Sequence, residues 1–133
     1  MTKILIIEDN EDIALQMKKY LTKNGYDVEI AGSFYEASFK MNIDIDVALL
    51  DINLPDEDGQ YLFEKLKEKD IRVLVTTVKN DENFIVNALD QGADDYLTKP
   101  FSLAILRARI DAVLRTIPLG QDKTIAYKDI NCL

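Results

Sequence analysis

The sequence predicts an α/β fold in which helices cover both faces of a five-stranded parallel sheet. Short apolar runs alternate with segments of helical periodicity, which is the pattern of repeated strand–helix units. In addition, polar side chains suited to chemistry follow four of the apolar runs. Because the carboxyl ends of parallel strands meet at one edge of a sheet, we expect these side chains to lie together.

The first half of the chain supplies three of the expected strands, at residues 3–8, 27–31 and 46–51. The helix after the first strand ends at Gly25, and its apolar face consists of Ile13, Met17, Tyr20 and Leu21. A weaker helix covers residues 33–41, with Ser33 as its N-cap. The third strand is apolar on both sides, so we expect it to be buried between two layers of helices.

The second half continues the same alternation after a loop at residues 53–59. A helix then runs to about residue 69, with Leu62, Phe63 and Leu66 pointing inward. Strands at residues 72–77 and 94–97 flank a helix at 81–91 that stops before Gly92. The last helix carries its apolar residues at spacings of three and four, namely Leu103, Leu106, Ile110, Val113 and Leu114.

A doubly wound, flavodoxin-like sheet with the strand order 2-1-3-4-5 reverses its winding between the first and third strands. These strands lead into Glu8 and Asp9 and into Asp51, respectively. Ligands bind at such a reversal, beyond the carboxyl ends of the strands. The acidic residues are therefore expected to line the site.

Composition excludes several classes of function for this 133-residue chain. Its net charge of −8 argues against direct binding of a nucleic-acid backbone. It contains no histidine, which excludes histidine-based triads and a phosphohistidine donor role. The single cysteine, Cys132, cannot form an internal disulfide, no apolar run is long enough to span a membrane, and the N-terminus is unlike a signal peptide. We expect a cytoplasmic protein.

The pattern of strands and helices changes near the C-terminus. Residues 1–116 are expected to form one domain, and residues 117–133 a linker with a possible first strand of a further domain. A lone strand cannot build a second core.

The polar residues at the strand ends suit phosphoryl chemistry. Oxygen ligands favour a hard cation such as Mg²⁺, and Asp9 and Asp51 fit that need. Lys99 and Thr77 can bind phosphoryl oxygens, and a carboxylate can itself be the nucleophile. Taken singly, these residues are better explained as helix caps, turn residues or a solvated lysine. Their joint occurrence at strand ends favours a site, and no glycine-rich dinucleotide or P-loop motif offers an alternative.

Four segments carry a family resemblance, namely ILIIEDN, DVALLDINLPDEDG, VLVTT and GADDYLTKPF. In order and spacing, the chain resembles a response-regulator receiver domain of two-component signalling over about residues 3–115. The resemblance implies that Asp51 accepts a phosphoryl group from the phosphohistidine of a sensor histidine kinase. It implies a signalling domain rather than an enzyme.

The same resemblance assigns roles to the surrounding residues. Asp9 and Asp51 bind Mg²⁺ with help from Glu8, and the backbone carbonyl of Asn53 completes the protein ligands. Thr77 and Lys99 contact the phosphoryl group. Tyr96 is the switch aromatic, and the bond between Lys99 and Pro100 is cis.

The phrase GADDYLTKPFS and Arg109 most resemble the OmpR/PhoB branch, and the tail TIAYKDI resembles the first strand of its winged-helix domain. This implies DNA binding only through a missing C-terminal domain, and a homodimer on phosphorylation. Two charge pairs of the usual dimer face are altered: one becomes Ile85 and Ile105, and another aligns with Asp90 and Asp111, which would repel. Asp95 and Arg109 match the remaining pair, predicted to join the two subunits.

Two departures and two alternatives accompany this interpretation. Val78 replaces a usual small residue and is expected to crowd the approach to Asp51, and Thr76 is polar where an apolar residue is usual.

The chain could instead be a stand-alone receiver that acts through protein contacts. A Mg²⁺-dependent phosphohydrolase that uses Asp51 as nucleophile is a further alternative, although Asn53 replaces the aspartate that such enzymes use as acid and base.

Overall fold

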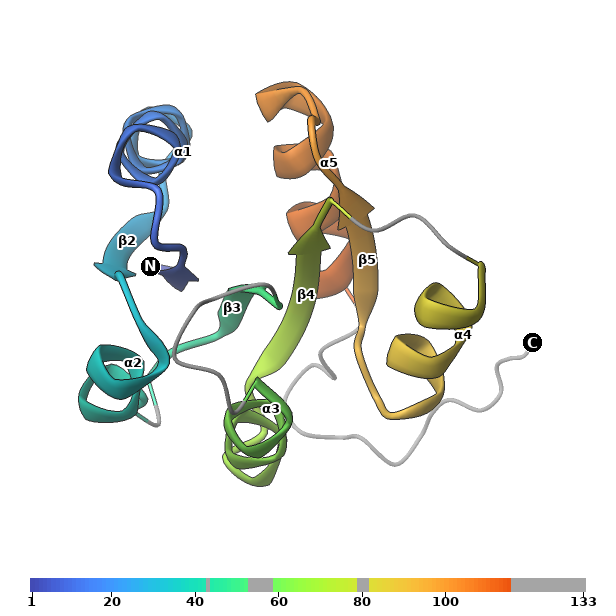
Figure 1. The fold of residues 1–133 in the computed structure, drawn as a ribbon. Coiled ribbons are helices and arrows are strands. Elements are labelled where there is room, and N and C mark those ends of the chain that lie inside the picture. Colours follow the sequence, from blue (N-terminus) through green and yellow to red (C-terminus); the bar gives the residue numbers. More distant parts are fainter. Residues whose placement is uncertain (43, 53–58, 79–81, 116–133) are drawn as a thin grey trace.

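The computed structural model describes residues 1–42, 44–52, 59–78 and 82–115 (Figure 1). It contains one parallel sheet of five strands in the order β2-β1-β3-β4-β5, which confirms the predicted topology. The strands are β1 (Lys3–Ile7), β2 (Asp27–Ala31), β3 (Val47–Asp51), β4 (Arg72–Thr77) and β5 (Asp95–Thr98). The helices are α1 (Glu11–Lys23), α2 (Phe34–Lys40), α3 (Gly59–Glu68), α4 (Glu82–Asp90) and α5 (Leu103–Leu114). The expected Asn53 ligand and the expected linker at 117–133 lie outside the described residues.

Helices cover both faces of the sheet, with α1 and α5 on one side and α2, α3 and α4 on the other (Figure 1). The strand residues explain this arrangement because successive side chains point to opposite faces. In β1, Ile4 and Ile6 pack in the core beneath α1 and α5, whereas Leu5 and Ile7 pack in the core beneath α2 and α3. All five residues of β3 are buried, as its apolar sequence predicts.

The predicted capping residues lie at helix ends, and the structure adds caps that were not predicted. Gly25 and Gly92 have positive φ angles of 94° and 113°, a conformation that favours glycine after a helix end. The Ser33 side chain accepts a hydrogen bond from the backbone N–H of Glu36 and caps α2. At the start of α1 the cap is Asn10, whose side chain accepts from the N–H of Ile13. Glu8 and Asp9 are therefore not the N-cap of α1.

Within the described part of the chain, no helix combines the length and apolarity needed to cross a membrane.

Candidate functional site

The predicted site residues converge at the carboxyl edge of the sheet. Glu8 follows β1, Asp51 ends β3, Thr77 ends β4, and Lys99 follows β5. One carboxylate oxygen from each of Glu8, Asp9 and Asp51 lies within 4.8 Å of the others. The parallel register brings these ends together because β1 pairs with β3, and β3 with β4.

Lys99 lies inside this acidic cluster. Its ammonium nitrogen donates to Glu8 Oε1 at 2.6 Å and to Asp51 Oδ2 at 3.1 Å. The sequence predicted that Lys99 belongs to the site but did not predict the shorter contact with Glu8. That contact depends on how β1 and β5 are placed on either side of β3 and β4, which no local pattern encodes.

The residues of the cluster differ in their exposure to solvent. Glu8 and Asp51 are only 3% and 4% exposed, and Thr77 is fully buried, whereas Asp9 is exposed. The backbone N–H of Asn10 donates to Glu8 Oε2 at 3.2 Å, which holds that carboxylate in place. Asp9 is thus the carboxylate most accessible to an incoming ion.

Burial and mutual hydrogen bonding shift the pKa values of Glu8 and Lys99. Desolvation raises the pKa of Glu8, and the hydrogen bond from Lys99 opposes that rise only in part. Burial by itself lowers the pKa of Lys99, but the hydrogen bonds to Glu8 and Asp51 outweigh it and raise the pKa above its ordinary value. Lys99 therefore remains a cation at neutral pH.

The donor set fits a hard divalent cation. All three clustered ligands are carboxylates, and oxygen ligands with room for water are what Mg²⁺ prefers. One ammonium group cannot balance three carboxylates at close range, and a second cation at the cluster would relieve the remaining repulsion. The Asn53 carbonyl, predicted as a further ligand, lies outside the described residues.

Thr77 and Tyr96 lie on the neighbouring strands β4 and β5. Tyr96 is 9% exposed and packs in the core beneath α2 and α3, where Ile85 and Ala88 of α4 also pack. The backbone N–H of Lys99 donates to the carbonyl of Thr77 at 2.7 Å. The Lys99–Pro100 bond is cis, as the resemblance implied. The switch coupling between Thr77 and Tyr96 stays a prediction.

Val78 is 66% exposed and lines a pocket of about 410 Å³ beside Lys99. The remaining lining residues are Ile13, Gln16, Met17, Pro100, Phe101 and Leu103. Sequence analysis missed this pocket because its walls come from α1, from the residue after β4 and from the segment that leads from β5 into α5. The predicted crowding of Asp51 by Val78 stays a prediction.

The residues predicted to form the dimer face differ in their exposure and in their contacts within one chain. Ile105 is 51% exposed, whereas Ile85 is partly buried against the core. Arg109 Nη1 lies 3.4 Å from Asp95 Oδ2, so this pair forms inside one subunit. The pairing of these two residues across a dimer therefore stays a prediction.

Asp111 is also bound within the chain. Its carboxylate accepts from the Tyr26 hydroxyl and, at 2.5 Å, from Arg107. Tyr26 follows α1, whereas Arg109 reaches β5, so Asp111 and Arg109 bind on opposite flanks of α5. The repulsion expected between Asp90 and Asp111 stays a prediction, and Arg107 already offsets the Asp111 charge within the chain.

Comparison with known proteins identifies the family. The family described as "Response regulator receiver domain" matches residues 4–111. The chain belongs to this family. As predicted, it is therefore a receiver domain of two-component response regulators and a signalling domain.

The receiver domain has curated relatives among transcriptional regulators. It is 41% identical over 128 residues to the transcriptional regulatory protein KdpE of Staphylococcus aureus, covering 95% of this chain and 55% of that protein. It is 36% identical over 118 residues to the virulence transcriptional regulatory protein PhoP of Salmonella typhimurium, covering 86% of this chain and 53% of that protein. These relatives confirm the OmpR/PhoB resemblance. The chain spans about half the length of each relative.

Solved receiver structures have the same fold. A two-component response regulator from Clostridium difficile superposes with a TM-score of 0.82 at 36% identity, over 90% of this chain and 100% of that one. A CheY-like receiver domain protein from Methanospirillum hungatei superposes with a TM-score of 0.79 at 33% identity, over 86% of this chain and 94% of that one.

Proposed function

We propose that the receiver domain accepts a phosphoryl group on Asp51 from the phosphohistidine of a sensor histidine kinase. The observation that carries the proposal is the position of Asp51, which ends the central strand 3.1 Å from the Lys99 ammonium and within the acidic cluster. In the reaction, the Asp51 carboxylate forms the new oxygen–phosphorus bond while the nitrogen–phosphorus bond of the donor breaks. The donor imidazole keeps the electron pair of the broken bond and takes a proton from water.

The surrounding residues stabilise the transferring group. Lys99 is charged and already next to Asp51, so it can neutralise a phosphoryl oxygen with little rearrangement. The Thr77 hydroxyl, at the end of the neighbouring strand, donates to another oxygen. With these groups the domain also phosphorylates itself slowly from small donors and slowly loses the phosphoryl group to water.

Asp9 and Asp51 are the proposed direct ligands of Mg²⁺, with Glu8 acting through water and the Asn53 carbonyl as a further ligand. When bound, the ion neutralises negative charge on the carboxylates and the phosphoryl oxygens. Asp9 is exposed, so Asp9→Ala should weaken Mg²⁺ binding without unfolding the domain. Calorimetric titration of Mg²⁺ into the variant measures that loss directly.

The proposed output is transcriptional. Two relatives are named as transcriptional regulators, and the chain spans about half of each, so a DNA-binding domain is expected to follow the receiver domain. Phosphorylation is proposed to favour a homodimer through Ile85, Asp95, Ile105 and Arg109. The net charge of −8 is consistent with leaving DNA contact to the other domain.

A phosphotransfer assay tests this proposal. An autophosphorylated histidine-kinase core, selected because it transfers to the parent chain, should fail to label Asp51→Asn. Asp27→Asn is a matched control because Asp27 is an exposed aspartate at the start of β2, at the opposite edge of the sheet. Equal labelling of Asp51→Asn and the parent contradicts the assignment.

A further inference from the structure

The outward side of α2 carries two exposed aromatic side chains. Tyr35 and Phe39 are 72% and 69% exposed, and among the large hydrophobic side chains of the described residues only Met1 is more exposed. Their ring centroids lie 5.0 Å apart at an interplanar angle of 85°, so the two rings are packed edge to face. Single exposed apolar side chains are common, but two adjoining rings form one apolar patch. We call Tyr35 and Phe39 the aromatic surface.

Two opposite charges lie along one side of the aromatic surface. Glu36 and Lys40 each follow one of the two rings by one position, and their charged groups are 3.6 Å apart. Both side chains also bind the backbone nearby. Glu36 accepts from the N–H of Gly32 at 2.7 Å, and Lys40 donates to the carbonyl of Ile30 at 2.7 Å. These hydrogen bonds hold the two charges in place beside the rings.

This arrangement is self-complementary when a second copy of α2 lies antiparallel to the first. Tyr35 of each copy then faces Phe39 of the other, as the two-fold symmetry of such a contact requires. On the flank, each Glu36 faces the Lys40 of the other copy, so opposite charges meet twice. If the helices were parallel, the charged flanks would lie on opposite sides of the contact and would not meet. The charges therefore select a second copy in the antiparallel orientation.

The opposite flank of the aromatic surface permits close approach. Ser38 is small, and its hydroxyl donates to the carbonyl of Tyr35 at 2.6 Å. This donor is therefore already satisfied when a second helix covers it.

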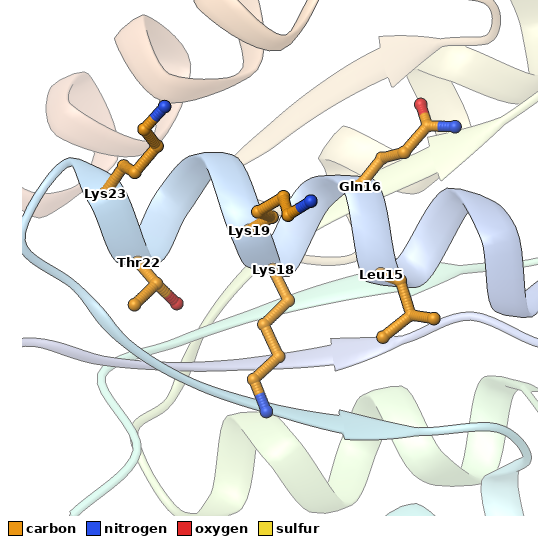
Figure 2. A pocket seen from close by; sticks show the side chains of 6 residues that line it. All are labelled: Leu15, Gln16, Lys18, Lys19, Thr22 and Lys23. Atoms are coloured by element: carbon orange, nitrogen blue, oxygen red, sulfur yellow. The ribbon is translucent and has the colours of Figure 1, made fainter.

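The exposed apolar residue of α1 lacks this self-complementarity. Leu15 lines a pocket on α1 together with three lysines, Lys18, Lys19 and Lys23 (Figure 2). Two copies of that face would bring like charges together. Because α1 lies on the other side of the sheet from α2, Leu15 is a suitable control position (Figure 1).

The aromatic surface is small. Covering both rings in both copies buries roughly 500 Å² of accessible surface, less than the roughly 1,200 Å² found in stable complexes. We therefore expect a dissociation constant on the order of 1 mM, and at low micromolar concentration the contact is not formed. The helix α2 packs beside β2, whereas α4 packs beside β5, so the aromatic surface and the proposed dimer face lie at opposite edges of the sheet.

We propose that the aromatic surface binds the aromatic surface of a second copy of this chain, with α2 antiparallel to α2. Each chain then has two separate self-association surfaces. Phosphorylated dimers would carry one aromatic surface at each end, and neighbouring dimers join through them. A weak contact is sufficient there, because chains held side by side on one partner reach millimolar effective concentrations. Only this joining of dimers rests on the proposed function.

Sedimentation equilibrium of the unphosphorylated chain tests the contact without a phosphodonor. The parent should be monomeric at low micromolar and partly dimeric at millimolar concentration. Phe39→Ala should weaken the association by roughly tenfold, because each copy loses one ring from the contact. Leu15→Ala, at a 59% exposed position of α1, should keep the parent value. Equal association of Phe39→Ala and the parent would overturn the proposal. A parent that stays monomeric at millimolar concentration would also overturn it and would leave the aromatic surface to a different partner.

Two charge reversals test the antiparallel orientation. In two copies of Glu36→Lys, or two copies of Lys40→Glu, like charges face each other, so each variant should self-associate roughly fivefold more weakly than the parent. An equimolar mixture of the two variants should associate more strongly than either alone, because opposite charges meet again in the mixed dimer. That recovery would also show that both variants are folded. A mixture that associates no better than the separate variants would refute the antiparallel contact. None of these outcomes depends on phosphorylation of Asp51.

Discussion

The ammonium nitrogen of Lys99 lies 3.1 Å from a carboxylate oxygen of Asp51, although 48 positions separate the two residues in the sequence. The same nitrogen lies 2.6 Å from Glu8. One side chain thus links the ends of β1 and β3 to the segment after β5. This cation offsets part of the negative charge that the sheet gathers at its carboxyl edge, and under the proposed function it would contact the phosphoryl group on Asp51.

Replacing Lys99 should have opposite effects on the metal and on phosphorylation. Lys99→Met removes a cation from the acidic cluster, so Mg²⁺ should bind more tightly. Phosphorylation of Asp51 should slow by on the order of 100-fold, because a charged partner of the phosphoryl group is lost. Calorimetry measures the first effect and labelling with acetyl phosphate the second. Lys69→Met, an exposed lysine after α3, is the control. Weaker Mg²⁺ binding in Lys99→Met would contradict this account.

Thr77 should be needed for the self-association that follows phosphorylation more than for the phosphorylation of Asp51 itself. In Thr77→Ala, Asp51 should still become phosphorylated. Without the hydroxyl, nothing should move toward the phosphoryl oxygen, and the Tyr96 ring should keep the conformations that it has in the unphosphorylated domain. Sedimentation velocity before and after phosphorylation should then show no gain in self-association. Thr76→Ala is the matched control, because Thr76 is a buried threonine of the same strand whose side chain points to the other face. A normal response of Thr77→Ala would refute the coupling.

The proposed dimer should depend on apolar contact at Ile105. Because this side chain is 51% exposed, Ile105→Glu should leave the fold and the phosphorylation of Asp51 intact. It should reduce self-association of the phosphorylated domain, and the dimer of the parent should weaken little when salt is raised. Analytical ultracentrifugation measures both effects.

The control for the dimer is Phe39→Glu, which places the same charge on an exposed apolar position of α2. Equal dimerisation of Ile105→Glu and the parent would show that another surface is used. Asp95 and Arg109 form an ion pair within one chain, at 3.4 Å. If they pair across the dimer as predicted, each has to leave this partner for the corresponding residue of the other subunit.

Glu36 should make the stability of the domain depend on pH. Its side chain accepts from the N–H of Gly32 at 2.7 Å, and this hydrogen bond lowers the pKa of Glu36 below its ordinary value of 4.5. A lowered folded-state pKa means that the stabilisation is present above the unfolded pKa and is lost as pH falls through the folded one. Glu36→Gln should therefore cost about 0.5 kcal/mol near neutral pH, a small effect because the residue is exposed.

Urea unfolding of the parent and Glu36→Gln, near neutral pH and below the ordinary glutamate pKa, checks this expectation. The difference in free energy of unfolding should shrink in acid. A difference that stays constant or grows in acid would mean that the Glu36 charge is not the cause.

Much of the fold was predictable because it depends on local patterns. The alternation of apolar runs and amphipathic segments predicted a parallel sheet covered by helices, and Gly25 and Gly92 marked helix ends by their need for positive φ. Placing Asp51 and Lys99 at strand ends was sufficient to predict that they meet. The contact of Tyr26 with Asp111 was not predictable, because it depends on how α1 and α5 pack against each other. The pocket at Val78 was missed for the same reason.

Intact-mass spectrometry of the domain after incubation with acetyl phosphate and Mg²⁺ tests the central claim most directly. Borohydride trapping and peptide mapping then locate the acyl phosphate. The account predicts the addition of one phosphoryl group, carried by Asp51, and no addition in Asp51→Asn or when Mg²⁺ is removed with a chelator. A phosphoryl group on another residue, or equal addition to Asp51→Asn, would contradict it.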